Sequence, residues 1–286
     1  MRQIANWLIT PEAVPYTVLT GWGILFILLL LLRGQLKARL SFPAIRVGNG
    51  QTIGLREEQD DYFATAFMEH GALAVLGDGI SGMANGRLAS TAAVTVFVKE
   101  FQRLGRSADL RSFFAGTARR SNEEIVSSLG GGRGGTTLVA AVVSDGLLYW
   151  GSVGDSILTV YRNGEFIPIN SRQTFGSVLQ SRYLSGEITK EEAVTNPLQH
   201  RLVNYLGHEG FKDIEVGNEP FRLQKKDKVI LCSDGVYHAL TEMEIEQLLR
   251  SSRHPQQAAE RIIEAVEAKG RSNQDNATIV ILDKGW

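Results

Sequence analysis

The chain has 286 residues, of which 43% are hydrophobic and 21% are charged, and its formal net charge is -1. This composition is typical of a folded globular protein that is long enough to bury a core. The near-neutral charge gives no electrostatic basis for binding nucleic acid, so no nucleic-acid partner is expected. The single cysteine, Cys232, excludes an internal disulfide, and its place in an apolar run predicts a core residue rather than a nucleophile.

Near the N-terminus, residues 13–32 pass without a charged side chain. A helix of this length would span about 30 Å, the thickness of the hydrocarbon layer of a bilayer. A core helix would have a polar face and a signal peptide would need a small-residue cleavage site, and the segment has neither. The sequence therefore predicts one transmembrane helix over 13–32 that contacts the lipid bilayer, after a short N-terminal segment, 1–12.

Basic residues flank this span unequally. They are Arg2 before it and Arg33, Lys37, Arg39 and Arg46 after it. Because positive charge favours the cytoplasmic side, we expect a single-pass protein of the cell membrane whose catalytic domain is cytoplasmic. The basic segment 33–46 is interpreted as a juxtamembrane linker, which could also rest on anionic headgroups.

Residues 47–286 are interpreted as one domain in which blocks of short apolar runs alternate with helical stretches. The strand-like runs are YFATAFM, ALAVLG, TTLVAAVV, LLYWGSVG, SILTVYR, EFIPI, KVILCS and ATIVIL. Tight turns such as Asn163-Gly164 join several of them, so neighbouring strands should be antiparallel. Helices are expected over 84–102, 108–129, 175–184, 241–250 and 255–269. This order predicts an α+β fold, a four-layer α-β-β-α sandwich of two antiparallel sheets flanked by helices.

Acidic residues recur where these apolar runs begin or end. They are Asp60 and Asp61 before YFATAFM, Asp78 in LGDG, Asp155 in VGDS, Asp234 in CSDG and Asp275 before ATIVIL. Each one alone is explained equally well as a turn or capping residue. Together they predict an edge where several carboxylates meet, and such a cluster repels itself unless cations neutralise it. Oxygen ligands select Mg2+ or Mn2+, and two such ions about 3.5–4 Å apart would form a binuclear hydrolytic site.

Six motifs, in order and spacing, resemble the metal-dependent protein phosphatases, the type 2C-like family, in its bacterial style. They are GLREEQDDYFAT, LGDGISGMANGRLAS, GGTTLVAAVV, YWGSVGDSILTVYRNGEF, VILCSDGV and NQDNATIVIL. The resemblance covers about residues 47–284. It implies two antiparallel sheets between helical layers and hydrolysis of phosphoserine and phosphothreonine with Mg2+ or Mn2+. The implied partners are phosphorylated proteins, in opposition to a serine/threonine kinase.

The resemblance also implies the metal ligands. Asp78 would bridge two ions, and the Gly79 carbonyl would bind the first, because a residue without Cβ allows close approach. Asp234 and Asp275 would hold the second ion. Asp155 would share a third, weaker ion with Asp234.

Three further residues match positions beside the metals. Asp60 and Asp61 correspond to an acidic pair that acts largely through bound waters, and Asp61 is also expected to be a metal-binding residue. Asp60 is shorter than the glutamate more often found at its position. Arg56 corresponds to the arginine that grips the substrate phosphate, for which a guanidinium fork is suited.

Two positions depart from the family pattern. Ile80 stands where some members have a histidine proposed as general acid. Arg172-Gln173 stands where the family often has an Asp-His pair, although the residues that follow still resemble the bacterial flap beside the active site. We therefore expect unusual substrate selection without loss of catalysis.

Two other functions remain open at this point. The fold could serve as a catalytically silent pseudophosphatase scaffold, or the same site could hydrolyse small phosphate esters or nucleotides. The glycine run LGGGRGGTTL lacks the Lys-Ser/Thr pair of a phosphate-binding loop. The five histidines show no metal-ligand spacing, so zinc is not expected.

Overall fold

The computed structural model describes residues 14–40, 45–80, 83–105 and 108–284; in the first of these ranges it describes the side chains of 19–33. Contacts divide the chain into two compact units, Met1–Phe42 and Pro43–Trp286.

The first unit is represented by helix α2 (Val14–Leu40), which has 27 residues. The helix continues past residue 32 into the segment predicted as a linker. Its large apolar side chains are exposed from Leu19 to Leu32. Among the residues whose side chains are described, no helix is long and apolar enough to cross a membrane. The predicted transmembrane helix is therefore not confirmed, and the predicted segment 1–12 lies outside the described residues.

The second unit contains two antiparallel sheets. The first has five strands, in the order β1 (Ile45–Thr52), β11 (Ala277–Lys284), β10 (Lys228–Cys232), β6 (Ile157–Arg162) and β7 (Glu165–Pro168). The second has the order β2 (Tyr62–Met68), β3 (Gly71–Gly77), β4 (Leu138–Ser144), β5 (Leu147–Val153) and β8 (Glu215–Val216), and β9 (Phe221–Arg222) also pairs with β5.

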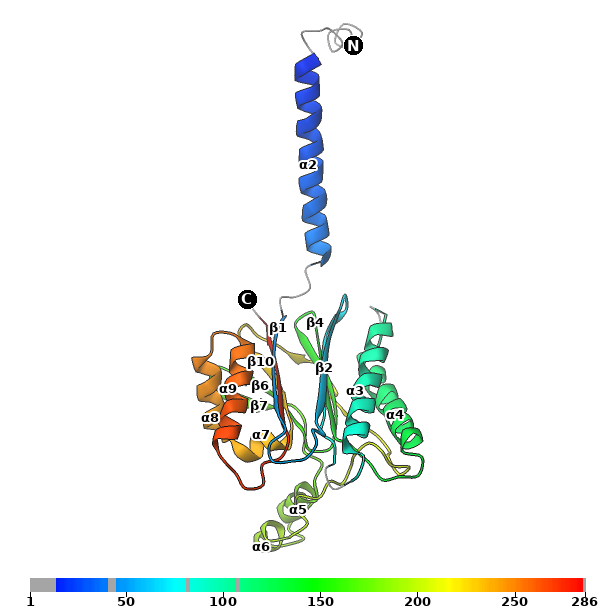
Figure 1. The fold of residues 1–286 in the computed structure, drawn as a ribbon, viewed down its shortest axis with the longest axis vertical. Helices are drawn as coiled ribbons and strands as arrows, with labels where there is room; N and C mark the ends of the chain where they lie inside the picture. The colour runs from blue at the N-terminus through cyan, green and yellow to red at the C-terminus, as the bar shows by residue number, and fades with distance from the viewer. Residues whose placement is uncertain (1–13, 41–44, 81–82, 106–107, 285–286) are drawn as a thin grey trace. The chain divides into compact units, whose positions relative to one another are not determined.

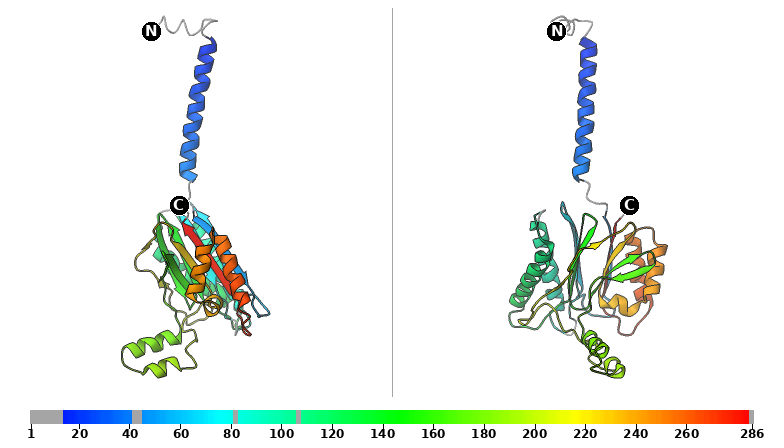
Figure 2. Two further views of the ribbon diagram at one scale, coloured as in Figure 1. Left: turned by 90° about the vertical axis from the view of Figure 1, so that its left-hand side faces the viewer. Right: turned by 180° about the vertical axis from the view of Figure 1, so that it is seen from behind.

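Helices cover the outer face of each sheet (Figure 1). Those on the second sheet are α3 (Gly86–Arg103) and α4 (Leu110–Leu129). Those on the first sheet are α7 (Asp234–Ala239), α8 (Glu242–Ser251) and α9 (Pro255–Ala268). Two more helices, α5 (Phe175–Leu184) and α6 (Lys190–Val194), lie away from both sheets (Figures 1 and 2). They belong to residues 171–214, which we call the flap.

Strand β3 shows why the layers form. Every residue of GALAVLG is buried, because both faces of the strand are covered. Leu73 and Val75 pack toward α3 and α4, whereas Ala74 and Leu76 pack against the other sheet. Alternating apolar side chains thus contribute to two cores at once, and burial of such side chains is the main favourable term in folding. The predicted mixed fold with two antiparallel sheets and helices is confirmed.

Strand β1 was not among the predicted strands. Its sequence, IRVGNGQT, contains two glycines, and glycine is depleted in strands. It forms nevertheless because β11 pairs with it from Ile45 to Thr52. The strand therefore begins ahead of residue 47, where the sequence placed the start of the domain.

Cys232 ends β10 and is buried. Burial, followed by the nearby charges of Asp234 and Asp61, raises the pKa of its thiol to about 12. A thiol that stays protonated at neutral pH is a poor nucleophile, which agrees with its predicted place in the core.

Candidate functional site

Acidic side chains converge where strands of the two sheets end. Asp78 follows β3 of the second sheet, and its pKa is raised well above the usual value. Burial is the largest cause, and the other causes are the charges of Asp61, Asp234, Asp155 and Asp275. We call these five residues the acid cluster.

One carboxylate oxygen of Asp61 has no hydrogen-bond partner among the described residues. The side chain is 2% exposed, and its Oδ2 accepts hydrogen bonds of 2.7 Å from the hydroxyls of Ser233 and Thr278. Its Oδ1 is buried and accepts no hydrogen bond among the described residues. Burial raises the pKa of Asp61 to about 6, against the lowering effect of the two hydroxyls. A buried oxygen left unpaired is costly unless a cation or water meets it.

The backbone of Asp78 and Gly79 is fixed by its neighbours. The carbonyl of Asp78 accepts hydrogen bonds from the Thr137 amide at 2.8 Å and the Thr136 hydroxyl at 2.9 Å. The amide of Gly79 donates to the Asp60 carbonyl at 3.2 Å. A Cβ at Gly79 would lie 2.6 Å from the Gly86 carbonyl, so no other residue fits without backbone movement. The Asp-Gly pair therefore reflects close packing of three chain segments, and it fixes where the Asp78 carboxylate begins.

Asp234 and Asp275 come from the first sheet. Asp234 opens α7 directly after β10, and Asp275 precedes β11, the neighbour of β10. Burial raises the pKa of Asp234 to about 7, and the charges of Asp155 and Asp275 add to the effect. Adjacent strands of one sheet thus place two carboxylates beside Asp78, which comes from the other sheet.

Asp155 lies in the turn between β5 and β6. Its Oδ2 accepts a hydrogen bond of 3.2 Å from the Tyr237 hydroxyl. Burial raises its pKa, while Tyr237 and the charge of Arg172 act in the opposite direction. Asp155 is therefore a member of the acid cluster and more than a turn residue.

Asp60 is held differently from Asp61. Its carboxylate meets the backbone amide of Arg87, at the start of α3, and packs 3.1 Å from where a Cβ at Gly86 would lie. Burial raises its pKa, with smaller contributions from Glu58 and Asp275. Asp60 therefore lies just before β2 with its carboxylate against the start of α3, at the edge of the acid cluster.

Arg56 stands at the mouth of the cluster. Its Nη2 lies 2.6 Å from Asp275 Oδ2, in an ion pair whose partners are both partly exposed. Arg56 lines an open cleft of about 570 Å³ together with Asp275, His200, His238 and Arg271. We call this hollow the Arg56 cleft, and it gives solvent access to the cluster.

The donor set of the cluster fits a hard divalent cation. Carboxylate oxygens prefer Mg2+ or Mn2+, and such an ion would offset the burial and the repulsion that raise these pKa values. The unpaired oxygen of Asp61 is a further fit. Within the described ranges, no three Asp, Glu, His or Cys side chains are arranged to hold a metal ion as they stand.

The raised pKa of Asp61 predicts a pH effect on stability in the absence of divalent ions. Its pKa is about 6 in the folded protein against 3.8 as the ordinary value, so the folded state holds the proton more tightly. The stability from this proton is complete below about pH 4 and is lost as the pH rises through about 6. In EDTA, the wild type should lose about 1.4 kcal/mol more than Asp61→Asn between about pH 5 and about pH 7.5. Urea unfolding of both proteins measures this, and equal pH slopes would contradict the burial of a repelled carboxyl at Asp61.

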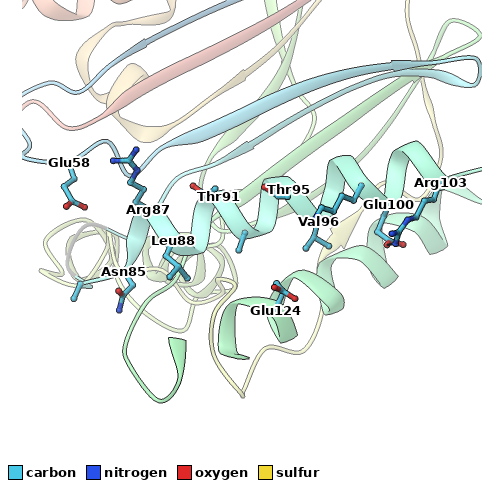
Figure 3. A pocket seen from close by; sticks show the side chains of 13 residues that line it. Glu58, Asn85, Arg87, Leu88, Thr91, Thr95, Val96, Glu100, Arg103 and Glu124 are labelled. Carbon is cyan, nitrogen blue, oxygen red and sulfur yellow. Dashed lines mark hydrogen bonds and ion pairs between the residues drawn. The ribbon is translucent and has the colours of Figure 1, made fainter. Parts of the chain in front are cut away.

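A separate hollow of about 820 Å³ runs along the outer side of α3 (Figure 3). Among its charged side chains, Glu100 pairs with Arg103, which also lines the hollow, and with Arg120, which does not. No member of the acid cluster lines it. This hollow is therefore separate from the acid cluster and from the Arg56 cleft.

Several residues that build the site were not predicted from the sequence. Ser233 and Thr278 orient Asp61, and Tyr237 bonds to Asp155. Asn276 accepts the Asp60 amide at 2.7 Å and donates to the carbonyls of Ile53 and Glu58. Ser233 and Asn276 adjoin Asp234 and Asp275 within the recognised motifs, which is the one signal that could have indicated them.

Known proteins are similar to this chain over most of its length. The family model described as protein phosphatase 2C matches residues 54–274. The serine/threonine phosphatase stp of Listeria innocua is 29% identical over 219 residues, which cover 74% of this chain and 84% of that protein.

Solved structures of known phosphatases have a similar fold. The serine/threonine phosphatase PstP/Ppp of Mycobacterium tuberculosis superposes with a TM-score of 0.70 at 27% identity, covering 85% of this chain and 99% of that one. The catalytic domain of the phosphatase PstP in complex with two manganese ions gives a TM-score of 0.67 at 27% identity, with coverages of 84% and 97%.

Proposed function

This chain belongs to the protein phosphatase 2C family of metal-dependent protein phosphatases, and we propose that it hydrolyses phosphoserine and phosphothreonine in proteins with two Mg2+ or Mn2+ ions. The observation that carries the proposal is the acid cluster, in which the charges of four other carboxylates help to raise the pKa of Asp78. All five acids of the cluster are present, whereas a catalytically silent scaffold would not need them. The proposed substrates are phosphoproteins that a serine/threonine kinase has modified.

The ligands proposed for these ions are the residues expected from the sequence. Asp78 would bridge them, the Gly79 carbonyl would serve the first, and Asp234 and Asp275 the second. Asp155 would share a third, weaker ion with Asp234. When bound, the ions lower the pKa of a water and polarise the phosphoryl group.

The side chains of the chain itself supply positioning. The hydroxyls of Ser233 and Thr278 donate hydrogen bonds to Oδ2 of Asp61 and so fix the orientation of the carboxylate. Its Oδ1 accepts no hydrogen bond among the described residues. Arg56 is exposed at the mouth of the cluster, where its guanidinium can exchange Asp275 for two phosphate oxygens. The Arg56 cleft is open enough to admit a phosphorylated side chain on a peptide.

A substrate panel tests the reaction class. The full chain with Mn2+ should release phosphate from phosphothreonine and phosphoserine peptides with a kcat/KM well above that for nucleoside monophosphates. A preference for nucleotides would instead support a hydrolase of small phosphate esters. No release from any substrate, with Mn2+ bound, would support a silent scaffold.

Replacing Arg56 by alanine should weaken phosphate capture. Loss of a charge-assisted hydrogen bond lowers kcat/KM by between about tenfold and about a hundredfold, mainly through KM. Affinity for Mn2+ should not fall, because removing the guanidinium frees Asp275. Steady-state kinetics and calorimetric metal titration measure the two effects. Arg253→Ala, which removes an exposed arginine outside the cleft, is the matched control, and a fall in metal affinity for Arg56→Ala would contradict the assigned role.

We also propose that residues 13–32 anchor the enzyme in the cell membrane with the phosphatase domain in the cytoplasm. Support comes from the uncharged sequence, from helix α2, and from its exposed apolar side chains, which water would not favour.

The anchor predicts that the full chain fractionates with membranes and resists extraction by carbonate. Lysines introduced together at Trp22 and Ile24 should release it, since each costs about 2.5–3.5 kcal/mol at the centre of a span. A C-terminal reporter that works only outside the cytoplasm should remain silent. Wild-type protein found in the soluble fraction would overturn the anchor, and an active reporter would overturn the orientation.

A further inference from the structure

A second hollow adjoins the acid cluster on the side of the flap. It has a volume of about 350 Å³ and lies between α7 and the helices α5 and α6. Asp155 and Asp234 form part of its wall, so it opens onto the acid cluster. His200 and His238 line both this hollow and the Arg56 cleft. We call it the flap-side pocket.

Two cationic side chains line the flap-side pocket, Arg172 and Lys190. Both are exposed, and neither forms an ion pair with any carboxylate in the described part of the chain. The guanidinium carbon of Arg172 lies 5.3 Å from the centre of the Tyr237 ring. Arg172 also makes a side-chain hydrogen bond to Tyr237. The other N–H donors of its guanidinium remain available for an anion.

The backbone around Arg172 is fixed on both sides. Before it, Ser171 donates from its amide and its hydroxyl to the two carboxylate oxygens of Glu215, at 3.2 and 3.0 Å. After it, the Gln173 amide donates to the Gly154 carbonyl at 2.8 Å, and Gln173 Oε1 accepts from Gly154 and Asn204. Hydrogen bonds therefore hold the backbone on both sides of Arg172, although this residue lies in a loop beside Asp155. It occupies the position where the sequence departs from the common Asp-His pair.

In the metal-free protein, the acids in the pocket wall offset part of this positive charge, because the charge of Arg172 lowers the pKa of Asp155. Under the proposed function, Asp155 and Asp234 would instead be neutralised by the ions they hold. Arg172 and Lys190 are then the charges of the pocket that remain uncompensated.

We infer that the flap-side pocket selects substrates in which an anionic side chain lies near the phosphorylated residue. This inference rests on the proposed function and names its substrate class: phosphopeptides with a flanking Asp or Glu, or with a second phosphate. The phosphate to be removed faces Arg56, and the flanking anion meets Arg172 and Lys190. Selection acts through binding, because these two residues contact the flank of the substrate and not the reacting phosphorus.

Matched phosphothreonine peptides test the inference on the full chain with saturating Mn2+. One peptide carries glutamate flanking the phosphothreonine and its partner carries glutamine there, with separate pairs for the two sides. A third peptide carries phosphoserine at the same position. We expect the wild type to prefer glutamate over glutamine by about tenfold in kcat/KM on one side, mainly through KM. The preferences for the glutamate peptide and for the phosphoserine peptide, each measured against the glutamine peptide, are then compared. The larger of the two identifies the anion that the pocket binds.

Variants assign the preference to Arg172. Arg172→Gln should bring the ratio between the paired peptides close to one, and Arg172→Lys should retain part of it. Because the ratio is measured within one protein sample, a partly unfolded fraction cancels. Arg182→Gln is the matched control: Arg182 lies on α5, pairs with Glu187 and does not line the pocket, so its variant should keep the wild-type ratio.

The outcomes separate this inference from the proposed function. If no peptide is hydrolysed, the proposed function fails and the inference with it. If all peptides are hydrolysed equally well, the function stands and the inference is wrong. If Arg182→Gln also lost the ratio, the preference would come from the general charge of the flap and the inference would be wrong. If Arg172→Gln lowered kcat/KM equally for both peptides, Arg172 would have a purely structural role, and the inference would again be wrong.

Discussion

Asp78→Asn is expected to lower the turnover of phosphopeptides by more than about a hundredfold, because changing a residue that only supports a metal ligand already costs between about tenfold and about a hundredfold. The amide has nearly the same shape as the carboxylate but carries no charge and offers one acceptor oxygen in place of two. It cannot bridge two cations, whereas the backbone bonds of Asp78 to Thr136 and Thr137 do not depend on the side chain.

The same variant should be more stable than the wild type in EDTA. Asp78 is disfavoured in its ionised form by burial and by four neighbouring charges, and asparagine removes that repulsion. Opposite effects on activity and on metal-free stability are the signature of a ligand cluster. Asp145→Asn, at an exposed turn where φ is 49°, is the matched control and should change neither quantity much. Near-wild-type turnover in Asp78→Asn would remove Asp78 from the mechanism.

Gly235→Ala is expected to reduce stability by about 3 kcal/mol, near the upper end for forced overpacking. A Cβ at Gly235 would lie 2.0 Å from the Asn276 carbonyl oxygen, which is backbone and cannot move alone. The displacement would separate α7 from the start of β11, so Asp234 and Asp275 would lose their relative positions. Urea unfolding measures the stability, and phosphopeptide assays measure the accompanying loss of activity.

Gly116→Ala provides the comparison for this substitution. Gly116 lies in α4 with nothing within 4 Å of its Cβ position. The alanine should therefore stabilise the protein by about 0.5–1 kcal/mol through its better helix propensity. If Gly235→Ala behaved like Gly116→Ala, the contact between α7 and the strand β11 would not be as close as the structure places it.

The layered fold could be predicted because its signals are local. Alternating apolar runs such as ALAVLG, short turns such as Asn163-Gly164, and blocks of helix between blocks of strand each indicate one step of the sandwich. The Asp-Gly pairs after β3 and β10 indicated that carboxylates meet at one edge. Residue types and chain order suffice for these inferences.

Other parts of the site depend on contacts between distant segments and could not be predicted. Asp60 and Asp61 are neighbours in the sequence, yet Asp61 faces Ser233 and Thr278 while Asp60 turns to the start of α3. The pairing of Arg56 with Asp275 joins residues at opposite ends of the domain. Strand β1 has weak strand character and forms because β11 offers a free edge.

The central claim is that the acid cluster works as the metal site of a protein phosphatase. Phosphate release from a phosphothreonine peptide, followed for the full chain first in EDTA and then after Mn2+ is restored in excess, tests it most directly. The account predicts no detectable release in EDTA, recovery with Mn2+, and no recovery in Asp78→Asn or Asp234→Asn. Turnover that continues unchanged in EDTA would contradict it.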